Sequence, residues 1–248
     1  MSFAYLDRAR STDFFATLKA TMLHALAPRP GTRVADLGCG TGDDTAAAAA
    51  IGAFAVGLDL SEPHIAEAHR RHRSTGVAFL VADGHHLPLA ADRLDGCLVE
   101  RTLQHVAEPQ TVVAEIARVL RRGGRLVVSE PDWASTTVVG GDVAVGNAIV
   151  QWWIDGHHRH PRLGQELVGC LVAADFDVLA ERSQSAVYRD LDEADRVFPL
   201  RRAAAEAGAD GIVPPPDAEA WLAALTAANN EGQFCFAVPM FTAVACRR

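Results

Sequence analysis

The sequence predicts an α/β domain in which a parallel sheet is covered by helices on both faces. Three observations lead to this prediction. Short apolar runs of strand length alternate with amphipathic stretches of helical period through the first half of the chain. These runs are apolar throughout, which is typical of parallel strands buried on both sides. The first run, residues 33–38, ends in closely spaced glycines and is followed at once by a helix pattern.

The elements follow one another in a regular order. The strand patterns lie at residues 33–38, 53–60, 77–83, 95–100, 125–130, 177–188 and 233–247. The helix patterns lie at residues 13–26, 43–51, 61–73, 107–120, 145–158 and 162–176, and residues 191–230 are mostly helical. Ser11 or Thr12 caps the first helix, and Ser61 caps the helix whose first turn holds Pro63.

Composition limits the classes of protein that fit. A chain of 248 residues with 49% hydrophobic residues can bury the core of one globular domain. A net charge of -8 argues against a nucleic-acid partner, which would reward clustered basic residues. The five cysteines are scattered, and neither a signal peptide nor an apolar run of about 18 residues is present. We therefore expect a cytoplasmic protein with reduced thiols and no membrane span.

Acidic residues stand at the ends of the first three strands. Asp36 lies two residues before Gly38, Asp59 ends the second strand, and Asp83 ends the third. The carboxyl ends of strands in an open parallel sheet share one crevice, so these three carboxylates would face the same ligand. The sequence therefore predicts a ligand rich in hydrogen-bond donors.

The glycine spacing argues against a dinucleotide. The pattern Gly38-x-Gly40-x-Gly42 ends one residue earlier than the dinucleotide fingerprint, and Asp43 and Asp44 would repel a pyrophosphate at the helix start. A cationic ligand without phosphate would tolerate them. S-adenosylmethionine is such a ligand, because it carries an ammonium, a ribose diol, an adenine amine and a sulfonium.

Four stretches in order resemble successive motifs of the class I S-adenosylmethionine-dependent methyltransferases, in the branch related to ubiquinone and menaquinone C-methyltransferases. They are VADLGCGTGDDT, VGLDLSEPHIAEAHRR, VADGHHLPLAADRLDGCLVERTLQHV and EIARVLRRGGRLVVSEPDW. The resemblance covers about residues 30–135. It implies a Rossmann-like, doubly wound sheet of seven strands, mostly parallel with a reversed last strand, together with helical cap segments.

The expected organisation is a single methyltransferase domain over residues 1–248. Within it we expect N-terminal cap helices at 1–27, a cofactor-binding core at 30–135, substrate-side helices with the sixth strand at 136–231 and the last strand at 232–248. The cap segments could close over the crevice. Their apolar side chains suggest a small, largely apolar substrate. The sequence does not decide whether the chain forms a homodimer.

The resemblance also implies roles for individual residues. The backbone of Gly38, Cys39 and Gly40 would approach the methionine part of the cofactor, and Asp36 would steer its amino group. Asp59 would accept both ribose hydroxyls, as a carboxylate can take two donors at once. Around the adenine and the methionine, the implied contacts are Leu60, Asp83, Gly84, His85 and the backbone of Glu100.

The chemistry expected at this site is an in-line attack of a substrate atom on the sulfonium methyl. The protein contributes proximity and a dry pocket, and a base only where the nucleophile must lose a proton. Candidate bases are His105, Glu130 and Asp132, with one member of the run His157, His158 and His160. We interpret that run as a polar loop rather than a metal site, so no metal is expected.

Aromatic side chains could stabilise the sulfonium through their ring faces. The candidates in the cap segments are Tyr5, Phe14, Trp133, Trp152 and Trp153. These residues do not distinguish methylation of an oxygen, a nitrogen or a carbon atom. The substrate would be a secondary metabolite or a quinone-like ring.

Three alternatives stay open. The same fold and cofactor site could serve a cyclisation or another rearrangement without methyl transfer, or the chain could be a non-catalytic partner subunit. A nicotinamide-dependent oxidoreductase is opposed by the glycine spacing and by the placement of Lys19, the only lysine, before the glycine motif.

Overall fold

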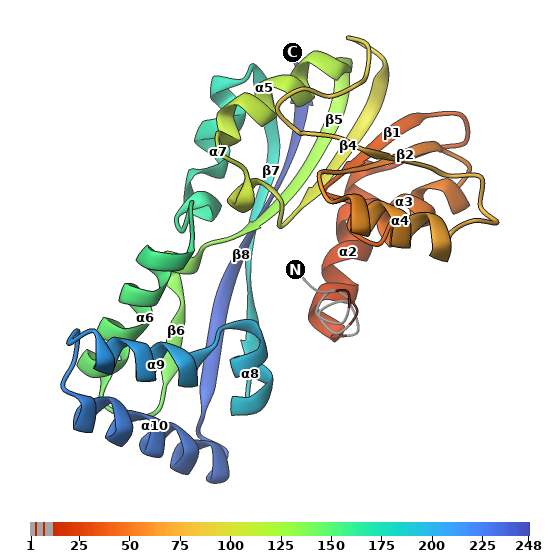
Figure 1. The fold of residues 1–248 in the computed structure, drawn as a ribbon. Helices are drawn as coiled ribbons and strands as arrows, with labels where there is room; N and C mark the ends of the chain where they lie inside the picture. The colour runs from red at the N-terminus through yellow and green to blue at the C-terminus, as the bar shows by residue number, and fades with distance from the viewer. Residues whose placement is uncertain (1–2, 4–6, 8–11) are drawn as a thin grey trace. The chain divides into compact units, whose positions relative to one another are not determined.

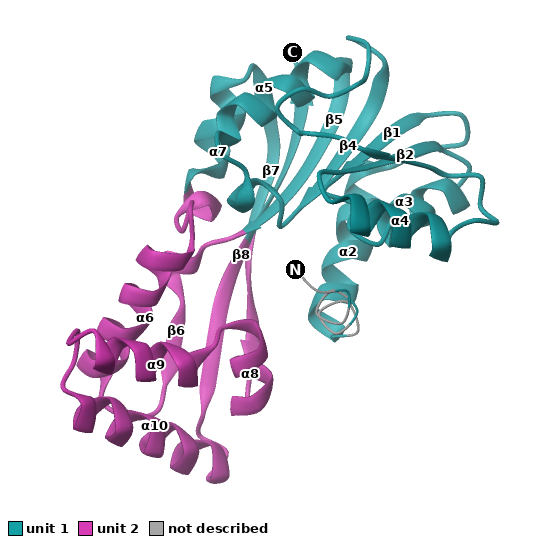
Figure 2. Ribbon diagram, viewed as in Figure 1, with its two compact units in different colours: residues 1–130, 166–182, 241–248 teal, residues 131–165, 183–240 magenta. Residues whose placement is uncertain are grey.

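The computed structural model describes Phe3, Asp7 and residues 12–248, and the chain forms two compact units (Figure 1, Figure 2). Unit 1 contains residues 1–130, 166–182 and 241–248, and unit 2 contains residues 131–165 and 183–240. The predicted roles of Tyr5 and Ser11 fall outside the described residues.

Unit 1 is built on parallel strands. They are β1 (Arg33–Leu37), β2 (Phe54–Asp59), β3 (Ala78–Val81), β4 (Leu94–Glu100) and β5 (Leu120–Pro131), whose last residue already belongs to unit 2. Their order in the sheet is β3-β2-β1-β4-β5, and every adjacent pair is parallel. In register, Leu37 pairs with Leu58 on one side and Val99 on the other, so the central strands end at the same level.

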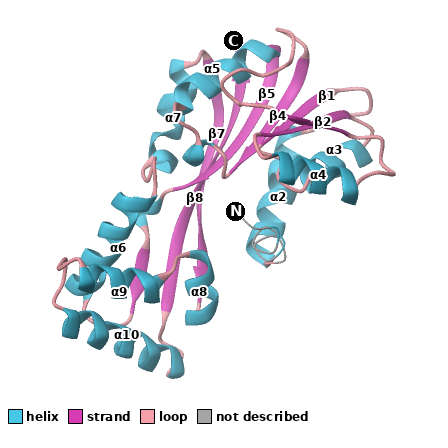
Figure 3. Cartoon of the chain, viewed as in Figure 1, coloured by secondary structure: helices cyan, strands magenta, loops and turns pink. Residues whose placement is uncertain are grey.

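Helices alternate with these strands in the order that the sequence predicts (Figure 3). They are α2 (Asp13–Leu26), α3 (Asp43–Ala50), α4 (Glu62–Arg71) and α5 (Pro109–Val119), together with the 3-10 helix η1 (Leu103–His105), which the sequence pattern does not predict. Helix α7 (Leu163–Ala173) precedes β7 (Phe176–Tyr188) later in the chain, and its first three residues belong to unit 2. Thr12 caps α2 by accepting from the N–H of Phe15, and Ser61 caps α4 by accepting from that of His64. Both predicted caps are confirmed.

Unit 2 is mainly helical. It contains the 3-10 helix η2 (Trp133–Ser135), α6 (Val143–His157), α8 (Leu191–Val197), α9 (Leu200–Ala209) and α10 (Pro215–Asn230). Trp221 of α10 is buried, and a Cβ atom on Gly146 of α6 would lie 2.7 Å from its Nε1 atom. Glycine at position 146 therefore lets α6 and α10 approach closely.

The long strands β7 (Phe176–Tyr188) and β8 (Cys235–Arg247) pair with each other, and the short strand β6 (Thr137–Val139) runs antiparallel to β8. Among the described residues the sheet has eight strands, in the order β3-β2-β1-β4-β5-β8-β6 with β7 beside β8. The predicted Rossmann-like α/β fold is confirmed. The strand beyond the predicted seven is β6, whose three residues are too few to show an alternating pattern.

Candidate active site

The segment between β1 and α3 is a tight loop built on three glycines. Gly38, Gly40 and Gly42 have φ angles of 75°, 53° and 82°, a region in which other residues are strained. A Cβ atom on Gly38 would lie 2.0 Å from Oγ1 of Thr102, so a larger residue does not fit there. Backbone conformation requires all three glycines, and packing requires Gly38 and Gly42 as well, because a Cβ atom on Gly42 would lie 2.5 Å from the Phe79 ring.

The loop is fastened to the end of β2 through Asp59. The N–H of Gly40 donates to Oδ2 of Asp59 at 2.9 Å, and the N–H of Ser61 donates to Oδ1 at 2.8 Å. A carboxylate offers about four acceptor positions. Asp59 therefore retains acceptor capacity, and it fits a ligand that brings a pair of hydroxyl donors.

Cys39 contributes backbone rather than side chain to this loop. Its N–H donates to the carbonyl of Leu58 at 3.1 Å, while its side chain packs against the buried cluster of Ile65, Ala68 and Phe79. Burial and the nearby carboxylate of Asp36 raise the pKa of the Cys39 thiol. The thiol is thus a neutral core group.

Asp36 lies buried near the end of β1. Its Oδ2 accepts a hydrogen bond from the hydroxyl of Thr45 at 2.7 Å. Burial and the neighbouring Asp44 carboxylate raise the pKa of Asp36 to about 7. A cation placed beside this carboxyl would favour its ionised form, so Asp36 fits the ammonium of S-adenosylmethionine.

The turn after β3 holds the groups predicted for adenine. Asp83 is half exposed and accepts from the N–H of His85 at 2.9 Å and from its Nδ1 at 2.6 Å, and these bonds lower the pKa of Asp83. Gly84 is buried, and a Cβ atom there would lie 3.2 Å from Val112. Leu60, after β2, is 70% exposed. An exposed apolar side chain and a half-exposed carboxylate fit a flat base bearing an amine.

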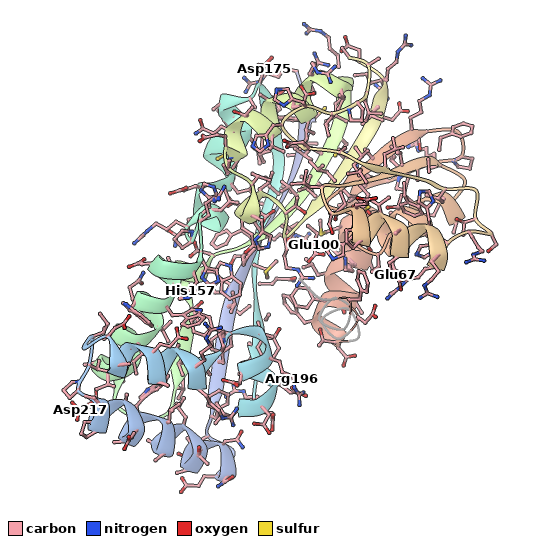
Figure 4. All side chains as sticks on the ribbon, in the orientation of Figure 1. Glu67, Glu100, His157, Asp175, Arg196 and Asp217 are labelled. Carbon is pink, nitrogen blue, oxygen red and sulfur yellow. The ribbon has the colours of Figure 1, made fainter. Side chains whose placement is uncertain are left out.

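A half-buried charge cluster adjoins the end of β4. Lys19 of α2 donates to Oε2 of Glu100 at 2.8 Å and also to the carboxylate of Asp44. Arg101 donates through Nε to Glu100, and its guanidinium carbon lies 4.2 Å from the ring centroid of Phe15. Figure 4 shows Glu100 at this end of β4. Two cations and two carboxylates thus form one network beside the glycine loop.

The cluster holds Glu100 and Lys19 in their charged forms. Burial alone would raise the pKa of Glu100, but Arg101 and Lys19 outweigh it and lower that pKa to about 2. Burial also disfavours the charge on Lys19, yet Glu100 and Asp44 raise its pKa above the usual value. Arg101 has a φ of 49°, unusual for a residue with a side chain, as is common at functional sites.

Sequence reasoning missed this cluster. The sequence nevertheless contains a signal for it. In the helix pattern Lys19 stands four residues after Phe15 and three before Met22, both of which are buried in α2. A lysine on the apolar face of a helix requires a buried anionic partner, and this one has two.

Of the three candidate bases, Glu130 and Asp132 belong to different units. Glu130 of unit 1 is fully buried, and its carboxylate accepts from the backbone N–H groups of Thr102, Leu103 and Gln104. Burial raises the pKa of Glu130 to about 8, although those three bonds oppose the shift. Its carboxyl is engaged with the loop that follows β4.

Asp132 of unit 2 is also fully buried. Its Oδ2 accepts from Nε2 of Gln165 at 2.6 Å, and Gln165 is held in turn by the hydroxyl of Ser135 at 2.9 Å. Within the part of the chain that the structure describes, Oδ1 of Asp132 has no hydrogen-bond partner. A buried carboxylate oxygen without a donor is costly, and it is available to a donor brought by a ligand.

His105 ends the 3-10 helix η1, and its N–H donates to the carbonyl of Thr102 at 3.0 Å. Partial desolvation of the ring and the charge of Arg101 lower the pKa of His105. The imidazole is therefore neutral at pH 7, a state in which it can accept a proton.

The histidine run of unit 2 lies among aromatic rings. His157, at the end of α6 (Figure 4), stacks on Trp153 with ring centroids 3.7 Å apart. The rings of His158 and Trp133 lie 4.6 Å apart, and His158 also stacks on Phe198. Adjacent histidines thus contact different aromatic partners. The described residues contain no group of three or more metal-ligating side chains.

The predicted aromatic candidates are distributed between the units. Phe14 lies in α2 of unit 1, with its ring centroid 5.1 Å from that of Phe15. Trp133, Trp152 and Trp153 lie in unit 2.

All five cysteines are free, and none of the described helices is both long and apolar enough to cross a membrane.

Comparison with known proteins agrees with this geometry. The family model of a methyltransferase domain matches residues 35–128. An uncharacterised 37.1 kDa protein in transposon TN4556 of Streptomyces fradiae is 37% identical over 246 residues, which cover 98% of this chain and 70% of that protein. A demethylmenaquinone methyltransferase of Clavibacter sepedonicus is 40% identical over 107 residues, covering 43% of this chain and 44% of the relative.

Among solved structures, the crystal structure of the 4+2 cyclase SpnF is 25% identical with a TM-score of 0.59, and the match covers 93% of this chain and 80% of SpnF. The match to the demethylmenaquinone methyltransferase spans less than half of that enzyme's length.

The chain belongs to the class I S-adenosylmethionine-dependent methyltransferases, and its cofactor is S-adenosylmethionine. The predicted family and cofactor are confirmed.

Proposed function

We propose that the protein methylates a small, largely apolar molecule, such as a quinone-like ring or a secondary metabolite, by direct in-line transfer. The observation that carries the proposal is a set of three carboxylates near the glycine loop that can accept hydrogen bonds. They are Asp36, Asp59 and Asp83, at the ends of β1, β2 and β3. The relatives support a small acceptor, because one is a demethylmenaquinone methyltransferase and another is an O-methyltransferase.

In this proposal each cofactor residue keeps the role that the sequence predicts. Asp36 faces the ammonium, Asp59 accepts the ribose hydroxyls, Asp83 accepts the adenine amine, and Leu60 packs against the ring. When bound, S-adenosylmethionine supplies an electrophilic methyl group on a sulfonium. The chain's own contribution is to orient that group, to exclude water and, where the acceptor is protonated, to remove a proton.

For the acceptor side we propose Asp132 of unit 2. Its unpartnered Oδ1 would accept a hydrogen bond from a hydroxyl or amine of the acceptor, while Gln165 fixes the other oxygen. A carboxylate held in this way can also take the proton that a hydroxyl acceptor loses. His105, neutral and at the end of η1, is the second group that could do so.

The test is calorimetric titration with S-adenosylmethionine, S-adenosylhomocysteine and NADH in parallel, followed by an acceptor screen read as a gain in mass of one methyl group. We expect the first two ligands to bind and NADH to give no binding signal. Binding of NADH alone would contradict the cofactor roles given above.

A second candidate function is a rearrangement without methyl transfer, and the similarity to the 4+2 cyclase SpnF favours considering it. The two candidates differ in what they consume. A methyltransferase stops when S-adenosylhomocysteine replaces S-adenosylmethionine. A cyclase would continue to convert its substrate into a product of unchanged mass.

A further inference from the structure

Glu130, at the end of β5, caps a neighbouring turn instead of offering a free carboxylate. Its Oε1 accepts from the N–H groups of Thr102 at 2.8 Å and Leu103 at 2.7 Å, and its Oε2 accepts from that of Gln104 at 3.4 Å. These are the first N–H groups of η1, which have no acceptor within so short a helix. The residue is fully buried, so no water can replace it in this role.

The turn that Glu130 caps is in contact with the predicted cofactor loop. The Thr102 hydroxyl lies 3.0 Å from the Glu100 carbonyl and 3.2 Å from the Leu37 carbonyl, so it bridges the ends of β4 and β1. The same side chain fills the space beside Gly38, where an added Cβ atom would lie 2.0 Å from Oγ1 and 2.7 Å from Cγ2. A shift of Thr102 would therefore change the surroundings of both Gly38 and the Glu100 backbone.

We propose that Glu130 is a positioning residue for the cofactor rather than a general base. Its carboxylate holds residues 102–104 so that Thr102 seats against Gly38 and the backbone of Glu100. The proposal rests on the assignment of these two residues to the methionine part of the cofactor site. The Glu130 carboxyl already accepts from three backbone N–H groups, and protonation would weaken its bonds to them.

The central test is Glu130→Gln, with S-adenosylhomocysteine as the probe, because no acceptor is then needed. One amide oxygen can still accept from Thr102 and Leu103, but the amide nitrogen would face the N–H of Gln104, donor against donor. We expect the Kd to rise about tenfold, the cost of one badly satisfied buried donor. A base that does not position the loop would leave the Kd unchanged on this substitution.

Ser129→Ala is the matched control. Ser129 is the preceding residue of β5 and is equally buried, but its hydroxyl bonds Thr242 at 2.8 Å and not the turn. We expect the variant to lose stability while keeping the wild-type Kd. Thr102→Ala tests the same link from its other end, and we expect its effect on the Kd to be smaller in the Glu130→Gln background than alone.

Amide hydrogen exchange gives a readout without any ligand. In Glu130→Gln the amides of residues 102–104 should exchange faster than in the wild type, and in Ser129→Ala they should not. An unchanged Kd for Glu130→Gln, or an equal rise for Ser129→Ala, would overturn the proposal while leaving the cofactor site intact. Failure of the wild type to bind S-adenosylhomocysteine would instead overturn the cofactor roles, and this proposal with them.

Discussion

The strand ends of unit 1 and the start of unit 2 treat buried charge in opposite ways. Beside the glycine loop, Lys19, Asp44, Glu100 and Arg101 are joined in one network of ion pairs. At the start of unit 2, Asp132 is fully buried, and one of its oxygens has no partner in the described residues. In the first region each charged side chain has a partner of opposite charge, whereas in the second a carboxylate oxygen can still accept a hydrogen bond.

Under the roles proposed above, this difference indicates how each region would meet its ligand. A completed network fixes geometry in advance, as expected for a site that always binds the same cofactor. A buried oxygen without a hydrogen-bond donor can be satisfied by a donor on a ligand. This is expected for a substrate site whose occupant varies between relatives. Four substitutions or conditions test this contrast.

The largest expected effect is that of Lys19→Met on folding. Removal of the ammonium leaves Asp44 and Glu100 without a shared partner, and breaking a buried ion pair from one side costs about 3–5 kcal/mol of unfolding free energy. Chemical denaturation measures it. The control is Arg70→Met, whose side chain is 63% exposed and, among the described residues, paired with Glu67 alone; this change should leave the midpoint close to wild type. Equal effects of the two changes would remove the contrast.

Next in size is Asp59→Ala on cofactor binding. The change removes charged hydrogen bonds to the ribose and to Gly40, so affinity for S-adenosylmethionine should fall by about 1.5–3 kcal/mol in calorimetry. Asp59→Asn, which keeps one acceptor oxygen, should lose less. Unchanged affinity in both variants would contradict the ribose assignment.

The third effect is the pH dependence of cofactor affinity. The pKa of Asp36 lies at about 7 and the cofactor is cationic, so protons compete with it below that pH. Affinity should therefore be constant above pH 8 and should fall by up to about tenfold per unit as the pH drops below 7. Asp36→Asn should abolish this slope. A slope that survives the substitution would point to a different group.

The smallest effect on cofactor affinity is expected for Asp132→Asn. The residue belongs to unit 2, and its partner is Gln165 rather than any group of the glycine loop. We expect cofactor affinity to stay at the wild-type value while turnover with an acceptor falls. A large loss of affinity would place Asp132 on the cofactor side.

Much of unit 1 could be predicted from the sequence because its signals are local. Helical and strand periods, the caps Thr12 and Ser61, and the glycine spacing each depend on residues close in the chain. The ion pairs of Lys19 join residues 25 and 81 positions apart, and such pairings follow only from the folded topology. The cap formed by Glu130 on η1 is hidden for the same reason, with a separation of 28.

Unit 2 was harder to predict. Its helices were recognised by their period, but strand β6 is three residues long and carries no pattern. The aromatic contacts of His157 and His158 depend on rings from η2, α6 and the segment before α9. The sequence showed the histidine run but not its partners.

The burial of Lys19 has a practical consequence, since it is the only lysine in the chain. Its side chain is 16% exposed and its ε-amine is bound to two carboxylates, so acylating reagents should reach it mainly when α2 lifts from the strand ends. The rate of acylation at this single position would then report the opening of the N-terminal helix. Protection by S-adenosylhomocysteine would read out cofactor binding by mass spectrometry, with no engineered label.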